Sequence, residues 1–136
     1  MSEDFAIDSN IAIYAFSKDE RRLASMELLR KGPKISVQLL NEFTSVSLRK
    51  RKIGWAEIEE SLDIITHLAS STRPIGYDVH DAGRIVAKRY GLGFYDSLIV
   101  AASLLDQCQV LYSEDMHHGL VINDQLTITN PFLELQ

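Results

Sequence analysis

Short apolar runs alternate along the chain with segments in which apolar residues recur every three or four positions. The short runs predict strands at 4–7, 34–37, 73–77 and 108–113, and two further extended pieces at 120–122 and 126–129. The longer segments predict helices at 9–16, 20–31, 38–52, 55–70, 78–91 and 94–107. Helices that separate strands imply crossover connections and therefore a parallel sheet. We expect an α/β fold, specifically a three-layer α/β/α sandwich whose short, mostly parallel central sheet has four or five strands.

Individual residues predict where some of these helices begin and end. Ser9 or Asn10 is expected to cap the first helix, and Asp78 the helix that follows 73–77. Gly91 is placed to end that helix. On the helix at 55–70, Trp55 is expected to belong to the apolar side.

The composition is that of an ordinary globular protein. Hydrophobic residues make up 46% and charged residues 24% of a 136-residue chain, which predicts one domain spanning residues 1–136. No apolar run reaches the roughly 18 residues of a membrane span, and the opening MSEDFAIDSN lacks the basic flank of a secretory peptide. The single cysteine, Cys108, excludes an internal disulfide and is expected to be buried. A cytoplasmic protein without a membrane partner is expected.

Four acidic residues fall where the predicted fold meets one edge of the sheet. Asp8 ends the first strand, Glu42 lies early in the helix after the second, Asp96 opens the apolar helix at 94–107, and Asp115 follows the fourth strand. Ligands of open α/β sheets bind outside the carboxyl ends of the strands. Each acid alone could cap a helix or complement its dipole, but four together repel one another unless a cation lies between them. Oxygen ligands suit Mg²⁺ or Mn²⁺, which would activate water for hydrolysis of a phosphodiester.

The net charge of −5 argues at first against a nucleic-acid partner. Without the four acids just named, however, 15 acidic residues stand against 14 basic ones. The basic run at 49–52 can then serve as a contact to an RNA backbone, since affinity for nucleic acid comes largely from phosphate contacts. A solvated helix face is the alternative interpretation. The run consists of Arg49, Lys50, Arg51 and Lys52.

Four segments, FAIDSNIAIYAF, ISVQLLNEF, YGLGFYDSLIVAAS and VLYSEDMHHG, together resemble the PIN-domain family. More narrowly, the chain is similar to VapC-type toxins, the ribonuclease half of bacterial toxin–antitoxin pairs, over residues 4–132. The resemblance implies a Mg²⁺- or Mn²⁺-dependent endoribonuclease that cuts single-stranded RNA, forms a homodimer and binds a small antitoxin. By position, Asp8 and Asp96 match the acids that hold the metal most directly. Glu42 matches the second acid of the pattern, and Asp115 the last and most variable one.

Other polar residues lie beside these acids in the sequence. Their hydroxyl or amide groups could orient a carboxylate or hydrogen-bond water at the metal, although helix capping explains them equally well. These candidates are Ser9, Asn10, Ser97 and Ser113. In the segment SEDMHHG, Glu114 is expected to be solvated or to serve a turn. His117 and His118 are adjacent, which does not match the i, i+4 spacing of zinc-binding helices.

A second function remains open at this point. The chain could be a catalytically silent PIN domain that binds RNA or a partner protein as a scaffold. Such a protein would bind RNA equally well with and without Mg²⁺ and would not cut it. A dinucleotide-binding protein is excluded because GLGFYD departs from the G-x-G-x-x-G pattern after two glycines.

Overall fold

The computed structural model describes residues 3–133, and it confirms the predicted α/β class. Its sheet has six strands in the order β3-β2-β1-β4-β6-β5, rather than the four or five expected. Neighbouring strands are parallel except β5, which runs antiparallel to β6. The strands are β1 Phe5–Ile7, β2 Lys34–Ser36, β3 Ser71–Arg73, β4 Val110–Tyr112, β5 Val121–Ile122 and β6 Leu126–Thr129.

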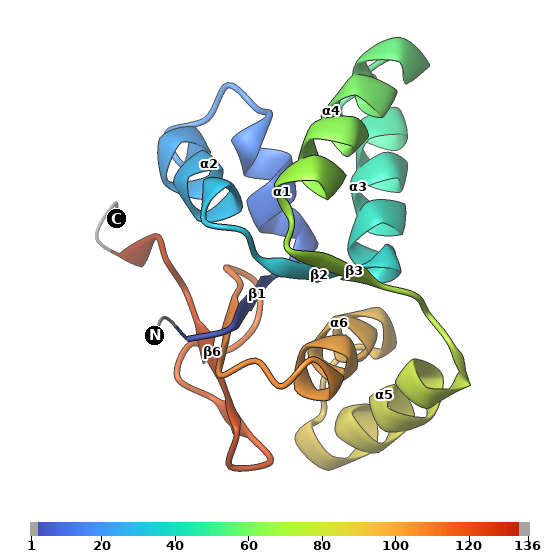
Figure 1. Ribbon diagram of the computed structural model, residues 1–136, viewed down its shortest axis with the longest axis vertical. Helices are drawn as coiled ribbons and strands as arrows, with labels where there is room; N and C mark the ends of the chain where they lie inside the picture. Colours follow the sequence, from blue (N-terminus) through green and yellow to red (C-terminus); the bar gives the residue numbers. More distant parts are fainter. Residues whose placement is uncertain (1–2, 134–136) are drawn as a thin grey trace.

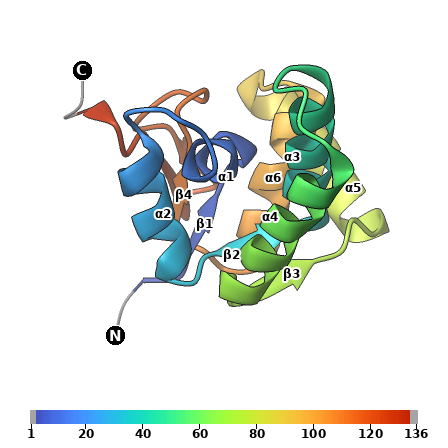
Figure 2. The ribbon, with the colours of Figure 1, turned by 90° about the horizontal axis from the view of Figure 1, so that it is seen from above.

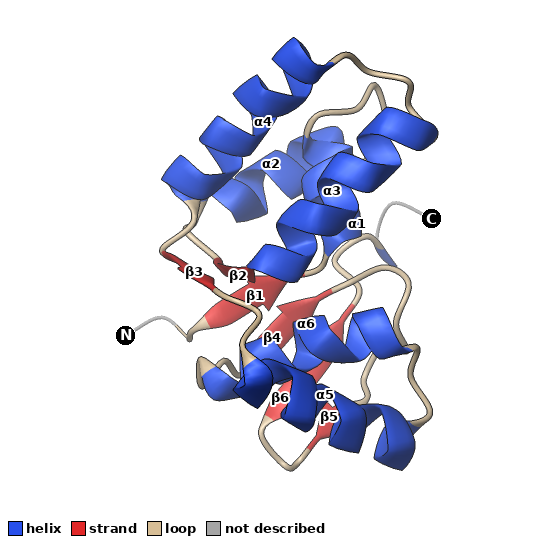
Figure 3. Cartoon of the chain, turned by 90° about the vertical axis from the view of Figure 1, so that its right-hand side faces the viewer, coloured by secondary structure: helices blue, strands red, loops and turns tan. Residues whose placement is uncertain are grey.

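Helices cover both faces of this sheet, as a sandwich requires. Figure 1 shows α1 to α4 on one side of the strands and α5 with α6 on the other, and Figure 3 shows the same layers from the side. The helices are α1 Ser9–Ala15, α2 Arg22–Arg30, α3 Val37–Arg49, α4 Trp55–Leu68, α5 Tyr77–Tyr90 and α6 Phe94–Leu105. Within residues 3–133, no helix combines the length and apolar character needed to cross a membrane.

Successive residues of the central strand supply two separate hydrophobic cores. Ala6 packs in the cluster beneath α5 and α6, whereas Ile7 packs in the cluster beneath α1 to α4. This follows from the strand period of two, which sends neighbouring side chains to opposite faces. Strands buried on both faces are therefore apolar throughout. Cys108 is fully buried, as predicted, and burial raises the pKa of its thiol to about 11.

Two sequence predictions about apolar segments are wrong in detail. The third strand was expected at 73–77 but ends at Arg73, because Pro74 has no N–H to donate to a neighbouring strand. Trp55 was expected on the apolar side of its helix, yet it is 57% exposed. It is the first residue of α4, where the side chain extends beyond the core that Ile58 and Ile65 enter.

The helix ends also differ from the predictions at two of three places. Asp8, not Ser9 or Asn10, is the N-cap of α1, and its carboxylate accepts a hydrogen bond from the Ser9 N–H. Gly76 rather than Asp78 precedes the first turn of α5, and Asp78 lies inside that turn. Gly91 ends α5 as predicted, in the left-handed conformation that glycine adopts without strain.

Candidate functional site

Three of the four acids meet at the carboxyl edge of the sheet. Asp8 directly follows β1, Glu42 lies in the second turn of α3, and Asp96 lies in the first turn of α6. Helix α3 begins immediately after β2, where Ser36 is the N-cap and accepts a hydrogen bond from the Leu39 N–H. One carboxylate oxygen from each of the three acids lies within 4.8 Å of the other two. A group of oxygen atoms this close together can hold a divalent cation.

Asp8 is the buried member of this group. It is 2% exposed and accepts hydrogen bonds from the Ser113 hydroxyl and the Ser9 N–H, both at 2.7 Å. Burial raises the pKa of Asp8 to about 7, opposed by the two hydrogen bonds and increased by the nearby charges of Asp96 and Glu42. Without a cation, this carboxylate is therefore far harder to ionise than an ordinary aspartate.

Glu42 is held at both oxygens. The Ser9 hydroxyl donates to Oε1 at 2.7 Å, and the Gln38 side-chain amide donates to Oε2 at 2.9 Å. Gln38 was not singled out in the sequence, although its position four residues before Glu42 on one helix face gives the signal. Across the site, burial raises the pKa of Asp96, and the charges of Glu42 and Asp115 raise it further.

The remaining predicted site residues differ in how closely they contact the three acids. Asp115 is exposed and lies outside the group of three, although near enough to act on the pKa of Asp96. Asn10 donates weakly to Asp8, at 3.4 Å. Ser97 does not orient a carboxylate, because its hydroxyl donates to the carbonyl of Gly93 one turn earlier in the chain.

An open cleft of about 440 Å³ is lined by two of the acids, Glu42 and Asp96. It lies between α3 and the start of α6, which are neighbours in Figure 2. Glu42 and Arg49 line it from α3, and Tyr95 and Asp96 line it from α6. Arg49 is exposed, and its Nε donates to the Ser45 hydroxyl one turn earlier on α3, at 3.0 Å.

The other bases of the run at 49–52 differ in their availability. Lys50 and Lys52 are exposed. Arg51 instead donates to the Phe16 carbonyl at 2.8 Å and to the Ser47 hydroxyl at 3.0 Å. Because its guanidinium is committed to the protein, Arg51 is the least suited of the four to contact RNA.

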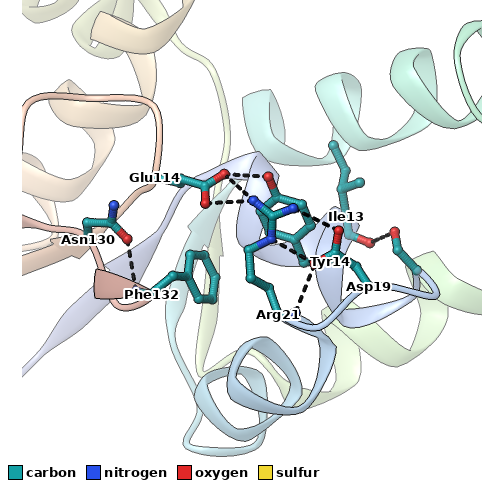
Figure 4. Close-up of polar contacts among 8 residues, drawn as sticks. Ile13, Tyr14, Asp19, Arg21, Glu114, Asn130 and Phe132 are labelled. Atoms are coloured by element: carbon teal, nitrogen blue, oxygen red, sulfur yellow. Dashed lines mark hydrogen bonds and ion pairs between the residues drawn. The ribbon is translucent and has the colours of Figure 1, made fainter. Parts of the chain in front are cut away.

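Glu114 was expected to be solvated or to serve a turn, but its carboxylate instead pairs with side chains from other segments. Both of its oxygens accept from Arg21 Nη1, and the Tyr14 hydroxyl also donates to it (Figure 4). Arg21 in turn lies 4.2 Å from the centre of the Tyr14 ring and binds Asp19 through Nε at 2.7 Å. The Phe132 ring meets Tyr14 edge-on. These contacts fasten the segment after β4, which carries Ser113 and Asp115, to α1.

The two adjacent histidines take no part in this group of acids. His117 and His118 are both exposed, and His118 Nδ1 accepts a hydrogen bond from the Asn130 N–H at 2.9 Å. Among residues 3–133, the cluster able to hold a metal contains Asp8, Glu42 and Asp96 alone. No ion pair described within those residues involves any of the three. A divalent cation therefore fits the charge of the site.

The metal-free protein is expected to lose stability as pH rises. The folded pKa of Asp8 is about 7 and the ordinary value is 3.8, so between these values the folded state holds a proton that the unfolded state has released. Stability is therefore greatest below the lower value and is lost as pH rises through the upper one. Urea unfolding in EDTA measures this effect at about pH 5 and about pH 8, for the wild type and for Asp8→Asn. The free energy of unfolding of the wild type should fall by about 2–3 kcal/mol more between these two pH values than that of Asp8→Asn. An equal pH dependence of stability in the wild type and Asp8→Asn would contradict this prediction.

Glu114→Ala is expected to destabilise the protein by about 2 kcal/mol, because it leaves the Tyr14 hydroxyl and the Arg21 guanidinium without their shared acceptor. Chemical denaturation measures this loss. Glu27→Ala on the exposed side of α2 is the matched control and should change stability by less than about 0.5 kcal/mol. Equal effects of the two substitutions would show that the contacts of Glu114 contribute nothing.

Comparison with known families identifies the class of protein. The family model described as PIN domain matches residues 5–119, and the chain belongs to this family. Comparison with curated protein sequences gives no match.

Solved structures with the same fold include proteins of toxin–antitoxin systems. A chain in the structure of VapBC2 from Rickettsia felis, bound to a DNA fragment from its promoter, has 21% identity and a TM-score of 0.64, covering 93% of this chain and 98% of that one. VapC20 of Mycobacterium tuberculosis, described as a toxin that cleaves the sarcin–ricin loop, has 17% identity and a TM-score of 0.65, with coverages of 82% and 90%. A toxin–antitoxin complex from Klebsiella pneumoniae has 18% identity and a TM-score of 0.68, with coverages of 94% and 97%.

Proposed function

We propose that this protein is a Mg²⁺- or Mn²⁺-dependent endoribonuclease that hydrolyses phosphodiester bonds in single-stranded regions of RNA. The observation that carries the proposal is the meeting of three carboxylates within 4.8 Å, in a chain of the PIN-domain family. An acidic cluster of this kind suits the metal ions that serve phosphoryl transfer. The same acids would be costly to keep together if the protein only bound RNA.

Asp8, Glu42 and Asp96 would hold the metal, with Asp115 close enough to act through a water molecule. When bound, the ion would supply a water of lowered pKa and would stabilise negative charge on the leaving oxygen. The residues around the acids keep them in place. Ser9 and Gln38 restrain both oxygens of Glu42 through the hydrogen bonds described above, so this carboxylate is oriented before any ligand arrives.

Arg49 would bind the substrate. Its guanidinium is held in the same cleft as Glu42 and Asp96, where it can pair with a phosphate next to the one that reacts. A phosphate bound by Arg49 would lie in the same cleft as Glu42 and Asp96, which places it near the proposed metal site.

The protein would act in the cytoplasm as the toxin of a toxin–antitoxin pair, as a single domain, a homodimer and the partner of a small antitoxin. Two of the similar structures are complexes of this kind, VapBC2 of Rickettsia felis and the complex from Klebsiella pneumoniae. Their full-length likeness to this chain supports the proposal. Co-purification with the product of a neighbouring gene would test it.

The direct test is cleavage of a mixed, structured RNA pool by purified protein in Mg²⁺, Mn²⁺ or EDTA. The wild type should cut with either metal and not in EDTA, and Asp8→Asn should not cut. Asp63→Asn, at an exposed acid on α4, is the matched control and should cut like the wild type. If nothing is cut and RNA binding is the same with and without metal, the protein is the silent scaffold described above.

A further inference from the structure

Four aromatic side chains form a continuous row from α5 to α6. Tyr77 stacks on His80 with 6.2 Å between ring centres, His80 meets Phe94 edge-on at 5.6 Å, and Phe94 meets Tyr95 at 5.6 Å. We call these residues the aromatic row. They come from the first turns of two neighbouring helices, so the row depends on how α5 packs against α6.

The aromatic row lies on the surface, although rings of this kind are usually buried in a hydrophobic core. Tyr77 is 78% exposed and Tyr95 is 64% exposed, while Phe94 is 37% exposed. Large aromatic rings gathered at one place on a surface mark a site of interaction, whereas single exposed apolar residues are ordinary. Trp55, which is also strongly exposed, lies on α4 and outside the row.

The row leads into the cleft that holds the acids. Tyr95 belongs both to the row and to the lining of the cleft, in which Asp96 and Arg49 also lie. A polymer that entered the cleft would therefore meet a phosphate-binding cation and a row of rings in succession.

The charged residues near the aromatic row do not prevent a polyanion from binding there. Two acids, Asp78 and Asp81, lie on α5 beside Tyr77 and His80. Asp81 is paired with Arg84, and Asp78 lies 3.5 Å from Arg73, which also binds Asp106 at 2.8 Å. Their negative charges are partly offset, so they do not close this surface to a phosphate backbone.

We propose that the aromatic row is a stacking platform for the bases of single-stranded RNA and that it holds the substrate strand that extends from the cleft. This inference rests on the proposed nuclease function and adds to it the place where substrate bases are bound. Aromatic faces stack on any base and need bases that are not already paired. The platform would therefore favour unpaired RNA with little preference for sequence.

Binding of a labelled oligoadenylate of about 12 nucleotides, followed by fluorescence anisotropy, tests the proposal. It is measured for the full chain in EDTA and again with Mg²⁺ in the Asp8→Asn background, so that the RNA stays intact. Tyr77→Ala and Tyr95→Ala should each weaken binding about tenfold, because each removes one stacking surface. A duplex of the same length should bind more weakly than the single strand.

Three controls separate stacking from other effects. Tyr77→Phe keeps the ring and should bind like the wild type, whereas the exposed Trp55→Ala should leave binding unchanged because it lies outside the row. Tyr77 is the more decisive of the two tyrosines, since its exposure makes a folding defect on truncation unimportant. If Tyr77→Ala and Tyr95→Ala bind RNA as the wild type does, or if duplex RNA binds as tightly as the single strand, the proposal is overturned.

The remaining outcome concerns a protein partner. If Tyr77→Ala lowers the mass of the protein in sedimentation while RNA affinity stays constant, the row is a contact between two copies of the chain, and the proposal is wrong.

The cleavage assay distinguishes failure of the stacking platform from failure of the nuclease proposal. If RNA binding does not depend on Tyr77 and Tyr95 while the wild type still cuts RNA with metal, the platform alone is refuted. Stacking-dependent binding by a wild type that cuts no RNA would refute the nuclease and leave the platform in place.

Discussion

Asp8→Asn is expected to abolish metal-dependent cleavage of RNA and, in the same protein, to stabilise the metal-free fold. Loss of activity follows because Asp8 supplies one of three oxygens within 4.8 Å. Substitution of a residue that only supports a metal ligand lowers activity about 10–100-fold. Substitution of the ligand itself should therefore lower the cleavage rate by more than about 100-fold. Stability rises because the substitution removes a buried charge whose pKa of about 7 records the cost of ionising it.

The size of the stabilisation follows from the same pKa. A shift from 3.8 to about 7 corresponds to on the order of 4 kcal/mol for ionised Asp8 above neutral pH, and asparagine should recover a large part of it. Thermal unfolding in EDTA at about pH 8 should therefore give a Tm several degrees above that of the wild type. Asp63→Asn is again the matched control and should shift neither Tm nor cleavage. A melting temperature lowered by Asp8→Asn would count against a repulsive cluster at this site.

Addition of Mg²⁺ or Mn²⁺ is expected to raise the melting temperature of the wild type. An ion that binds the folded state alone stabilises it by about 2.7 kcal/mol at a concentration of 100 Kd, which corresponds to a shift on the order of 10 °C for a chain of this size. The shift should be larger at about pH 8 than at about pH 6, because below a pKa of about 7 the ion must displace a proton from Asp8.

Differential scanning calorimetry across a series of metal concentrations measures this effect. NaCl at matched ionic strength controls for general screening of the acids. In Asp8→Asn the shift should largely disappear, while Asp63→Asn should retain it. An equal shift in wild type and Asp8→Asn would mean that the ion binds elsewhere on the protein.

Neither the aromatic row nor the contacts that fasten Glu114 could be found in the sequence. Tyr77 and His80 are close in the chain, but their neighbour Phe94 comes from the next helix. Likewise, Tyr14 and Arg21 lie near each other in sequence, whereas Glu114 is nearly a hundred residues away. No local pattern reports such contacts, since they depend on how separate helices and loops pack.

The sequence by itself determined the fold class, the order of strands and helices, and the edge at which Asp8, Glu42 and Asp96 lie. These follow from hydrophobic periodicity and from the rule that parallel strands bring their carboxyl ends to one side. Only the tertiary structure decided that Asp115 stays outside the group of three and that Arg51 donates to the carbonyl of Phe16, which is distant in the sequence. Burial and hydrogen-bond partners are properties of side chains from distant segments in three dimensions, and local sequence does not encode them.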